Sequence, residues 1–156
     1  MTSPSLLAGL DSKVEVEYSQ FHVEDEGSAW LRDDSIASPE PPDEGELVRA
    51  GTDWICISSG AGDHTASARL EAWSGQPELQ QGWEATADFT FAATTGRVFL
   101  NSLTMGPSSE DTLLIGQPGT YHGRVYSSGR REAREASQHG DLPEGLEHYV
   151  IQFWSA

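Results

Sequence analysis

Cationic side chains are scarce in this 156-residue sequence. Lysine and arginine together number nine, against 25 aspartates and glutamates, which gives a formal net charge of -16. Such an excess opposes binding to phosphate backbones and to anionic lipid surfaces, because like charges repel each other. We therefore expect neither a nucleic-acid partner nor a membrane partner.

Cysteine is also nearly absent, since the sequence contains only Cys56. One thiol forms no internal disulfide and no cysteine-based zinc site, so we expect a cytoplasmic protein that does not depend on oxidising conditions. No apolar run approaches the roughly 20 residues of a membrane-spanning helix. The first ten residues lack a basic start and a long apolar stretch, so we expect no signal peptide.

Alternation of apolar and polar residues begins at the segment Val14-Glu15-Val16-Glu17-Tyr18. This spacing predicts a strand with one solvent-exposed face. The apolar positions then change phase to Phe21 and Val23. The change predicts a β-bulge or a strand that crosses between two sheets.

Further short segments rich in β-forming residues follow along the chain. Strands are predicted at 53–58, 66–73, 83–91, 97–103, 111–115, 120–126 and 147–154. The connection Thr94-Thr95-Gly96 predicts that the strands before and after it form a hairpin. Good helix propensity is confined to 130–136, where the lack of a wide apolar stripe leaves a helix and an exposed turn both open.

Together these segments predict an all-β fold, an antiparallel β-sandwich of about eight strands. We expect one domain over residues 13–156, preceded by a tail over residues 1–12. A long acidic loop over residues 24–46 is expected after the first strand, because this stretch contains three prolines and shows neither helical nor strand periodicity.

The negative charge is concentrated toward the start of the chain. Residues 1–46 hold twelve acidic side chains against Lys13 and Arg32, and therefore ten of the sixteen net charges. Two interpretations stay open: a solvated loop that aids solubility, and a surface that attracts a basic protein. On the second interpretation, the partner contacts are Glu24, Asp25, Glu26, Asp33, Asp34, Asp43 and Glu44.

Catalytic and metal-binding motifs are missing from the sequence. The five histidines stand outside the H-x-H and H-E-x-x-H spacings of metal sites, although convergence of His22, His122 and His148 from separate strands stays open. Cys56 lies between apolar neighbours, which predicts an inert, buried thiol. There is no G-x-S-x-G elbow and no P-loop lysine. We therefore expect no catalytic residue, no metal site, no cofactor and no enzymatic activity.

Aromatic residues near strand ends support an alternative function. Most aromatic positions match a core, but Trp73 and Trp83 lie where a ligand-binding face would begin, and Arg124 follows on another predicted strand. A small-molecule or carbohydrate-binding sandwich using Trp73, Trp83 and Arg124 is the alternative hypothesis.

Two stretches resemble known proteins over about half of the chain. The segment from Val14 to Val23 resembles the first strand of the competence protein J family, whose best known member inhibits a DNA-entry nuclease. The motifs G-x-Y-x-x-R-V, starting at Gly119, and Y-x-I-Q-x-W, ending at Trp154, are similar to those of uncharacterised actinobacterial proteins. The resemblance implies a non-enzymatic β-sandwich that neutralises a nuclease or another toxin, and it transfers no functional residue. With the acidic charge, it leads to the hypothesis of an immunity or inhibitor protein that binds a basic nuclease or toxin.

Overall fold

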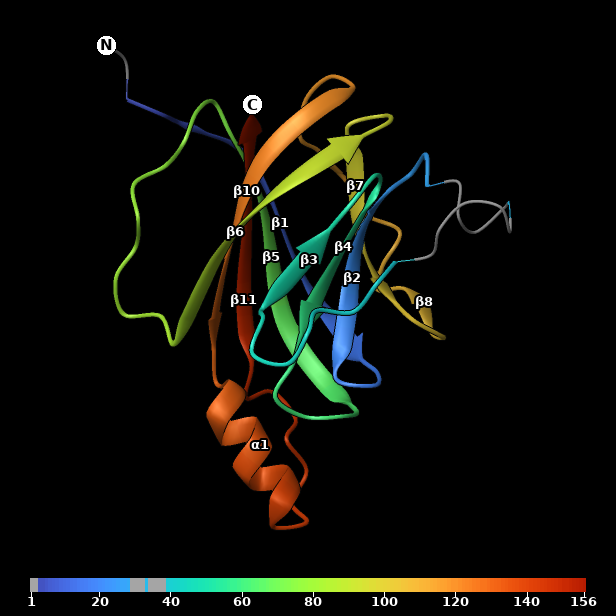
Figure 1. Ribbon diagram of the computed structural model, residues 1–156, viewed down its shortest axis with the longest axis vertical. Helices are drawn as coiled ribbons and strands as arrows, with labels where there is room; N and C mark the ends of the chain where they lie inside the picture. Colours follow the sequence, from blue (N-terminus) through green and yellow to red (C-terminus); the bar gives the residue numbers. More distant parts are fainter. Residues whose placement is uncertain (1–2, 29–32, 34–38) are drawn as a thin grey trace.

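Two β-sheets packed face to face form the molecule (Figure 1). The computed structural model describes residues 3–28, 33 and 39–156. The first sheet has five strands in the order β1 (Leu6–Val16), β5 (His64–Trp73), β11 (His148–Ser155), β10 (Gly119–Ser128) and β6 (Ala85–Ala93). The second sheet has the order β3 (Val48–Ala50), β4 (Trp54–Ser58), β2 (Gln20–Asp25), β7 (Arg97–Ser102) and β8 (Gly106–Pro107), with β9 (Leu113–Leu114) also paired to β7.

Neighbouring strands are antiparallel, except for β5 and β11, which are parallel. The predicted all-β antiparallel sandwich is therefore confirmed. Its core lies between the sheets, where the alternating residues Val14 and Val16 of β1 face inward. An edge-to-face contact between Phe21 and Tyr149, with ring centroids 4.9 Å apart, joins β2 of the second sheet to β11 of the first.

The phase change after Tyr18 marks a passage between the two sheets. β1 pairs with β5 in the first sheet, whereas β2 pairs with β4 and β7 in the second. Phe21 and Val23 consequently reach the core from the opposite side to Val14 and Val16. Of the two interpretations of the changed spacing, the crossing strand is the one observed.

Two predicted boundaries in the N-terminal part are wrong. The proposed tail over residues 1–12 contains most of β1, which starts at Leu6 opposite Trp73 of β5. This pairing satisfies the backbone of β5 although the first residues of β1 alternate poorly. The proposed loop over residues 24–46 starts too early, because β2 continues to Asp25 between β4 and β7.

The predicted hairpin around Thr94-Thr95-Gly96 is also wrong. β6 pairs with β10 in the first sheet, whereas β7 pairs with β2 in the second. The chain reverses at Gly96, where φ is +84° and an added Cβ would lie 2.1 Å from the carbonyl oxygen of Gly116. A glycine-containing turn indicates reversal, but it does not decide whether the flanking strands pair with each other.

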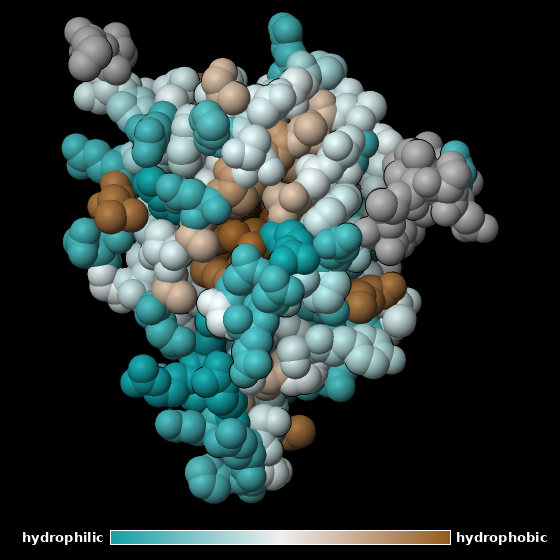
Figure 2. All heavy atoms as spheres, in the orientation of Figure 1, coloured by the Kyte–Doolittle hydropathy of each residue, from teal (hydrophilic) through white to brown (hydrophobic). Residues whose placement is uncertain are grey.

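One helix, α1 (Arg130–Gln138), follows β10 at the end of the sandwich opposite the chain termini (Figure 1). Its one buried residue is Ala133. The face of α1 seen in Figure 2 is mainly hydrophilic. Of the two alternatives for this segment, the helix is therefore correct. Within the described residues, no helix is long and apolar enough to cross a membrane.

Candidate functional site

Two of the predicted partner contacts, Glu24 and Asp25, are fully buried. The Asp25 carboxylate accepts hydrogen bonds from the backbone nitrogens of Gly27 and Gly96, at 2.7 and 2.8 Å, and from the Thr95 hydroxyl at 2.8 Å. Glu24 Oε2 lies 2.5 Å from the side-chain nitrogen of Asn101 on β7. Neither carboxylate is accessible to a partner, so the prediction is wrong for both residues.

A second aspartate completes this arrangement. Asp53 accepts hydrogen bonds from the backbone nitrogen of Thr94 at 2.7 Å and from its hydroxyl at 2.5 Å. We call Asp25, Asp53 and the turn Thr94-Thr95-Gly96 the crossover clamp. Buried backbone donors need acceptors, and these two carboxylates supply them where the chain leaves one sheet for the other.

The other predicted contacts that the structure describes, Glu26, Asp33, Asp43 and Glu44, are exposed. Asp34 lies outside the described residues. Among the described residues, acidic side chains gather around Arg49 on the segment that precedes β3. We call residues 39–47 the acidic loop.

The acidic loop is held by one guanidinium group. Arg49 donates hydrogen bonds to Glu40, Asp43 and Glu46 over distances of 3.1, 2.8 and 3.2 Å. The carboxylate of Asp43 is the main cause of the raised pKa of Arg49. One cation balances only part of three nearby carboxylates, so the acidic loop keeps a net negative charge.

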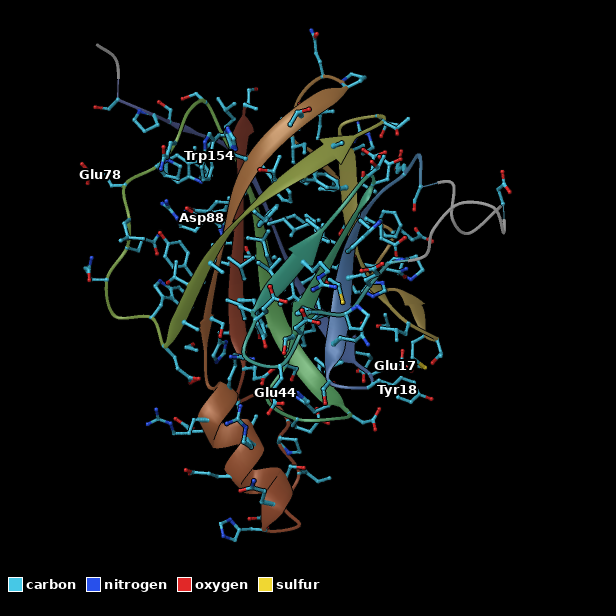
Figure 3. All side chains as sticks on the ribbon, in the orientation of Figure 1. Glu17, Tyr18, Glu44, Glu78, Asp88 and Trp154 are labelled. Atoms are coloured by element: carbon cyan, nitrogen blue, oxygen red, sulfur yellow. The ribbon has the colours of Figure 1, made fainter. Side chains whose placement is uncertain are left out.

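A carboxylate that the sequence did not single out organises the end of β1. Glu17 accepts hydrogen bonds from the backbone nitrogens of Thr104 and Met105, at 2.9 and 3.2 Å, and from the Thr104 hydroxyl. The bond from the Thr104 side chain is the main cause of the lowered pKa of Glu17. Glu17, Tyr18 and Glu44 lie toward the end of the sandwich that carries α1 (Figure 3). Sequence alternation identifies Glu17 only as a solvent-facing strand residue.

A serine, a histidine and a glutamate meet in the interior. Ser59 Oγ lies 2.8 Å from His64 Nε2 and donates a hydrogen bond of 2.7 Å to Glu147, which also accepts from Tyr149 at 2.8 Å. In a catalytic triad the acid holds the ring nitrogen opposite the serine. Here Glu147 contacts the serine itself, and among the described residues His64 Nδ1 has no hydrogen-bond partner. All four side chains are buried, so this geometry supports a structural function.

Histidine convergence is not observed. His22 is on β2 of the second sheet, and His122 and His148 lie far apart in register on β10 and β11 of the first. Within the part of the chain that the structure describes, no group of three or more His, Cys, Asp or Glu side chains is arranged to hold a metal ion. Cys56 is buried, and burial raises the pKa of its thiol to about 12.

The residues of the alternative hypothesis lie at the outer side of the first sheet; they are Trp73, Trp83 and Arg124. Arg124 is only 6% exposed, and its guanidinium donates to Asp88 at 2.8 Å and lies 5.6 Å from the ring centre of Trp154. Figure 3 shows Asp88 and Trp154 on this side of the sandwich. Arg124 therefore already has an ionic and an aromatic partner.

Trp73 and Trp83 are partly buried and line different grooves. The groove at Trp83 has a volume of about 480 Å³ and also contains Lys13, Arg69 and His148. The groove at Trp73 is about 390 Å³ and lies beside the 77–80 segment. The three predicted residues thus do not form one continuous binding face.

Comparison with known proteins places the fold but not the sequence family. No protein-family model matches the chain, and no curated protein matches its sequence. Two solved structures are similar over nearly the whole chain. ComJ from Bacillus subtilis, an inhibitor of the DNA-degrading activity of NucA, is 15% identical with a TM-score of 0.59 and covers 99% of this chain and 100% of its own. The crocagin biosynthetic protein J is 12% identical with a TM-score of 0.57 and covers 96% of this chain and 99% of its own. The resemblance to competence protein J is thereby confirmed at the level of the fold.

Proposed function

We propose that this chain is a non-catalytic inhibitor or immunity protein that binds a cationic protein, such as a nuclease or toxin, and blocks it. The observation that carries the proposal is the acidic loop, with its exposed carboxylates around Arg49, in a protein with a net charge of -16. Glu44 adds to this loop an exposed carboxylate with no ion pair among the described residues.

The acidic loop would attract a cationic protein electrostatically. At physiological salt, charges act over a Debye length of about 8 Å, so clustered carboxylates accelerate encounter with a cationic surface. A nuclease cleft that attracts phosphate groups also attracts carboxylates, which would then compete with DNA for the same positive charges. The fold likeness to ComJ supports this proposal, because ComJ inhibits a nuclease.

The test is binding to a panel of cationic bacterial nucleases and toxins, including any encoded beside this chain. Affinity is measured by biolayer interferometry at about 50 mM and about 500 mM salt, and inhibition by degradation of a labelled DNA duplex. We expect binding that weakens at least tenfold at the higher salt, because screening shortens the range of the attraction. Absence of binding to every member of the panel at the lower salt would sink the proposal.

The groove at Trp83 supports a second candidate function, binding of a small polar ligand such as a carbohydrate. Lys13 and His148 line this groove and have no ion-pair partner within the described residues, Asp11 and Arg69 line it as an ion pair, and Trp83 offers an aromatic wall. Tryptophan fluorescence titrated with sugars, nucleotides and aromatic acids tests this function. Quenching that disappears in a Trp83→Leu variant supports it, and an unchanged spectrum with every ligand excludes it for that panel.

A further inference from the structure

The turn between β1 and β2 has an unusual backbone for its residues. Tyr18 and Ser19 have φ values of +53° and +62°. Backbone hydrogen bonds of 3.0 and 3.1 Å between Glu17 and Gln20 close the turn. Two consecutive positive φ values in such a turn are typical of type I′, which strongly favours Asn-Gly.

Neither turn residue is one that adopts this conformation easily. A residue with a Cβ is disfavoured at positive φ, and a bulky aromatic residue there is a clear outlier. Packing does not compensate at Tyr18, because 72% of this residue is exposed. Backbone strain of this kind concentrates at functional sites, where an observed outlier is grounds for a functional hypothesis.

Neighbouring contacts hold the turn firmly. The backbone of Ser19 bonds to Gly62 at 3.0 Å and to Ser59 at 2.8 Å. On the other side, Glu17 binds the backbone of Thr104 and Met105. Met105 is 70% exposed, and its backbone bonds to Glu17, the residue directly before the exposed Tyr18. We call Tyr18 and Met105 the apolar tip.

We propose that the apolar tip is the anchor of the interface with the cationic partner, and this inference rests on the proposed function. Tyrosine contributes large contact area at low entropic cost, and methionine adapts to irregular pockets, so both are typical of binding hot spots. The partner that fits is a protein with an apolar pocket surrounded by lysine and arginine side chains.

Charges around the apolar tip favour that partner. Glu17 precedes Tyr18 and binds the backbone of Met105. Asp63 is exposed on the neighbouring turn, and Glu15 lines the groove beside Met105. Lys13 lines the same groove and reduces the local excess without reversing it. The acidic loop therefore steers the partner from a distance, whereas the apolar tip supplies the short-range contact.

The decisive variant replaces Tyr18-Ser19 by Asn-Gly, the pair that the turn prefers. We expect this double substitution, Tyr18→Asn with Ser19→Gly, to raise the midpoint of urea unfolding and to lower the affinity for the partner at least 30-fold. A loss of binding together with a gain in stability is an outcome that misfolding does not produce. The probe is whichever member of the cationic panel binds the wild-type chain, measured at about 50 mM salt.

Two single substitutions serve as controls. Tyr18→Phe keeps the ring and is expected to bind within threefold of wild type. Leu142→Asn changes another exposed apolar side chain, beyond α1, and is expected to leave affinity unchanged.

The outcomes separate the anchor from the proposed function. If the wild-type chain binds and the Asn-Gly variant binds equally well, the anchor is overturned and the proposed function stands. If the wild-type chain binds no member of the panel, both are overturned. Equal weakening by Leu142→Asn would also overturn the anchor, because the effect would then be nonspecific.

Discussion

Two groups of carboxylates from the same acidic stretch have opposite environments. Asp25, at the end of β2, is fully buried and accepts hydrogen bonds from the turn between the sheets. Asp43, less than twenty residues further on, is exposed beside Arg49 on the acidic loop. Both residues are aspartates within acidic runs of the sequence. The comparison teaches that strand pairing, not acidity, decides whether a carboxylate here stabilises the fold or charges the surface.

The largest expected effect is at the crossover clamp. Asp25→Ala removes the acceptor of the Thr95, Gly96 and Gly27 donors and leaves the buried backbone nitrogen of Gly96 without this partner. We expect a loss of about 3 kcal/mol or more in the free energy of unfolding, measured by urea denaturation. A matched Asp43→Ala variant serves as the control. Equal stability of the two variants would contradict the difference between buried and exposed carboxylates.

A smaller loss is expected in the Ser59 cluster. Glu147→Gln keeps the shape of the side chain but weakens the hydrogen bonds from Ser59, Gly60 and Tyr149. We expect a decrease of about 2 kcal/mol in the free energy of unfolding, seen as a lower melting temperature in calorimetry. An exposed Glu135→Gln variant on α1 is the control. A Glu147→Gln protein as stable as wild type would show that this buried charge is dispensable.

Glu71 extends the comparison to pH. Burial raises the pKa of this carboxyl, but hydrogen bonds from Trp73, Arg69 and Gln152 outweigh burial, so the pKa is lowered overall. A carboxyl with a lowered folded pKa stabilises the protein above its unfolded pKa, near 4.3, and this stabilisation disappears as pH falls through the folded value.

The matching test compares wild type with Glu71→Gln across pH. We expect the variant to be less stable by about 1 kcal/mol at pH 7, with the difference shrinking below about pH 4. Urea midpoints of both proteins between pH 7 and pH 3 measure it. A difference that stays constant over this range would rule out the ionised carboxylate as the source.

The smallest effect on stability is expected in the acidic loop. A triple variant with Asp43→Asn, Glu44→Gln and Glu46→Gln should keep the urea midpoint of wild type, because exposed ion pairs contribute little. Its association rate with a cationic partner should fall several-fold at low salt and converge with that of wild type at high salt. A large drop in stability would erase the contrast with Asp25.

Part of this structure follows from local sequence pattern. The alternation around Val14 and Val16 predicts a strand with one buried face, and the phase change at Phe21 and Val23 predicts either a β-bulge or passage to another sheet, of which the structure shows the passage. Both depend on the two-residue period of a strand, which is a local property. The exposure of Asp43 and Glu44 likewise follows from their position on a polar, proline-containing segment.

The two-residue period does not predict which strands pair when they are far apart in the sequence. The segment Thr94-Thr95-Gly96 predicts a turn, but β10 and β2 are the strands that pair with its two arms. The burial of Asp25 follows from that pairing, since two of its donor residues, Thr95 and Gly96, lie 70 and 71 positions away in the sequence. The apolar tip was missed because alternation marks Tyr18 only as the last residue of a strand, and its positive φ is visible only in the structure.

By itself, the sequence determined the all-β class, the scarcity of cationic charge and the location of the acidic excess, because composition and two-residue periodicity are properties of the chain. The tertiary structure decided which carboxylates are buried, which strands are partners and which side chains project from the strained turn between β1 and β2. These depend on contacts between residues far apart in sequence, where the need to satisfy buried hydrogen-bonding groups outweighs local preference.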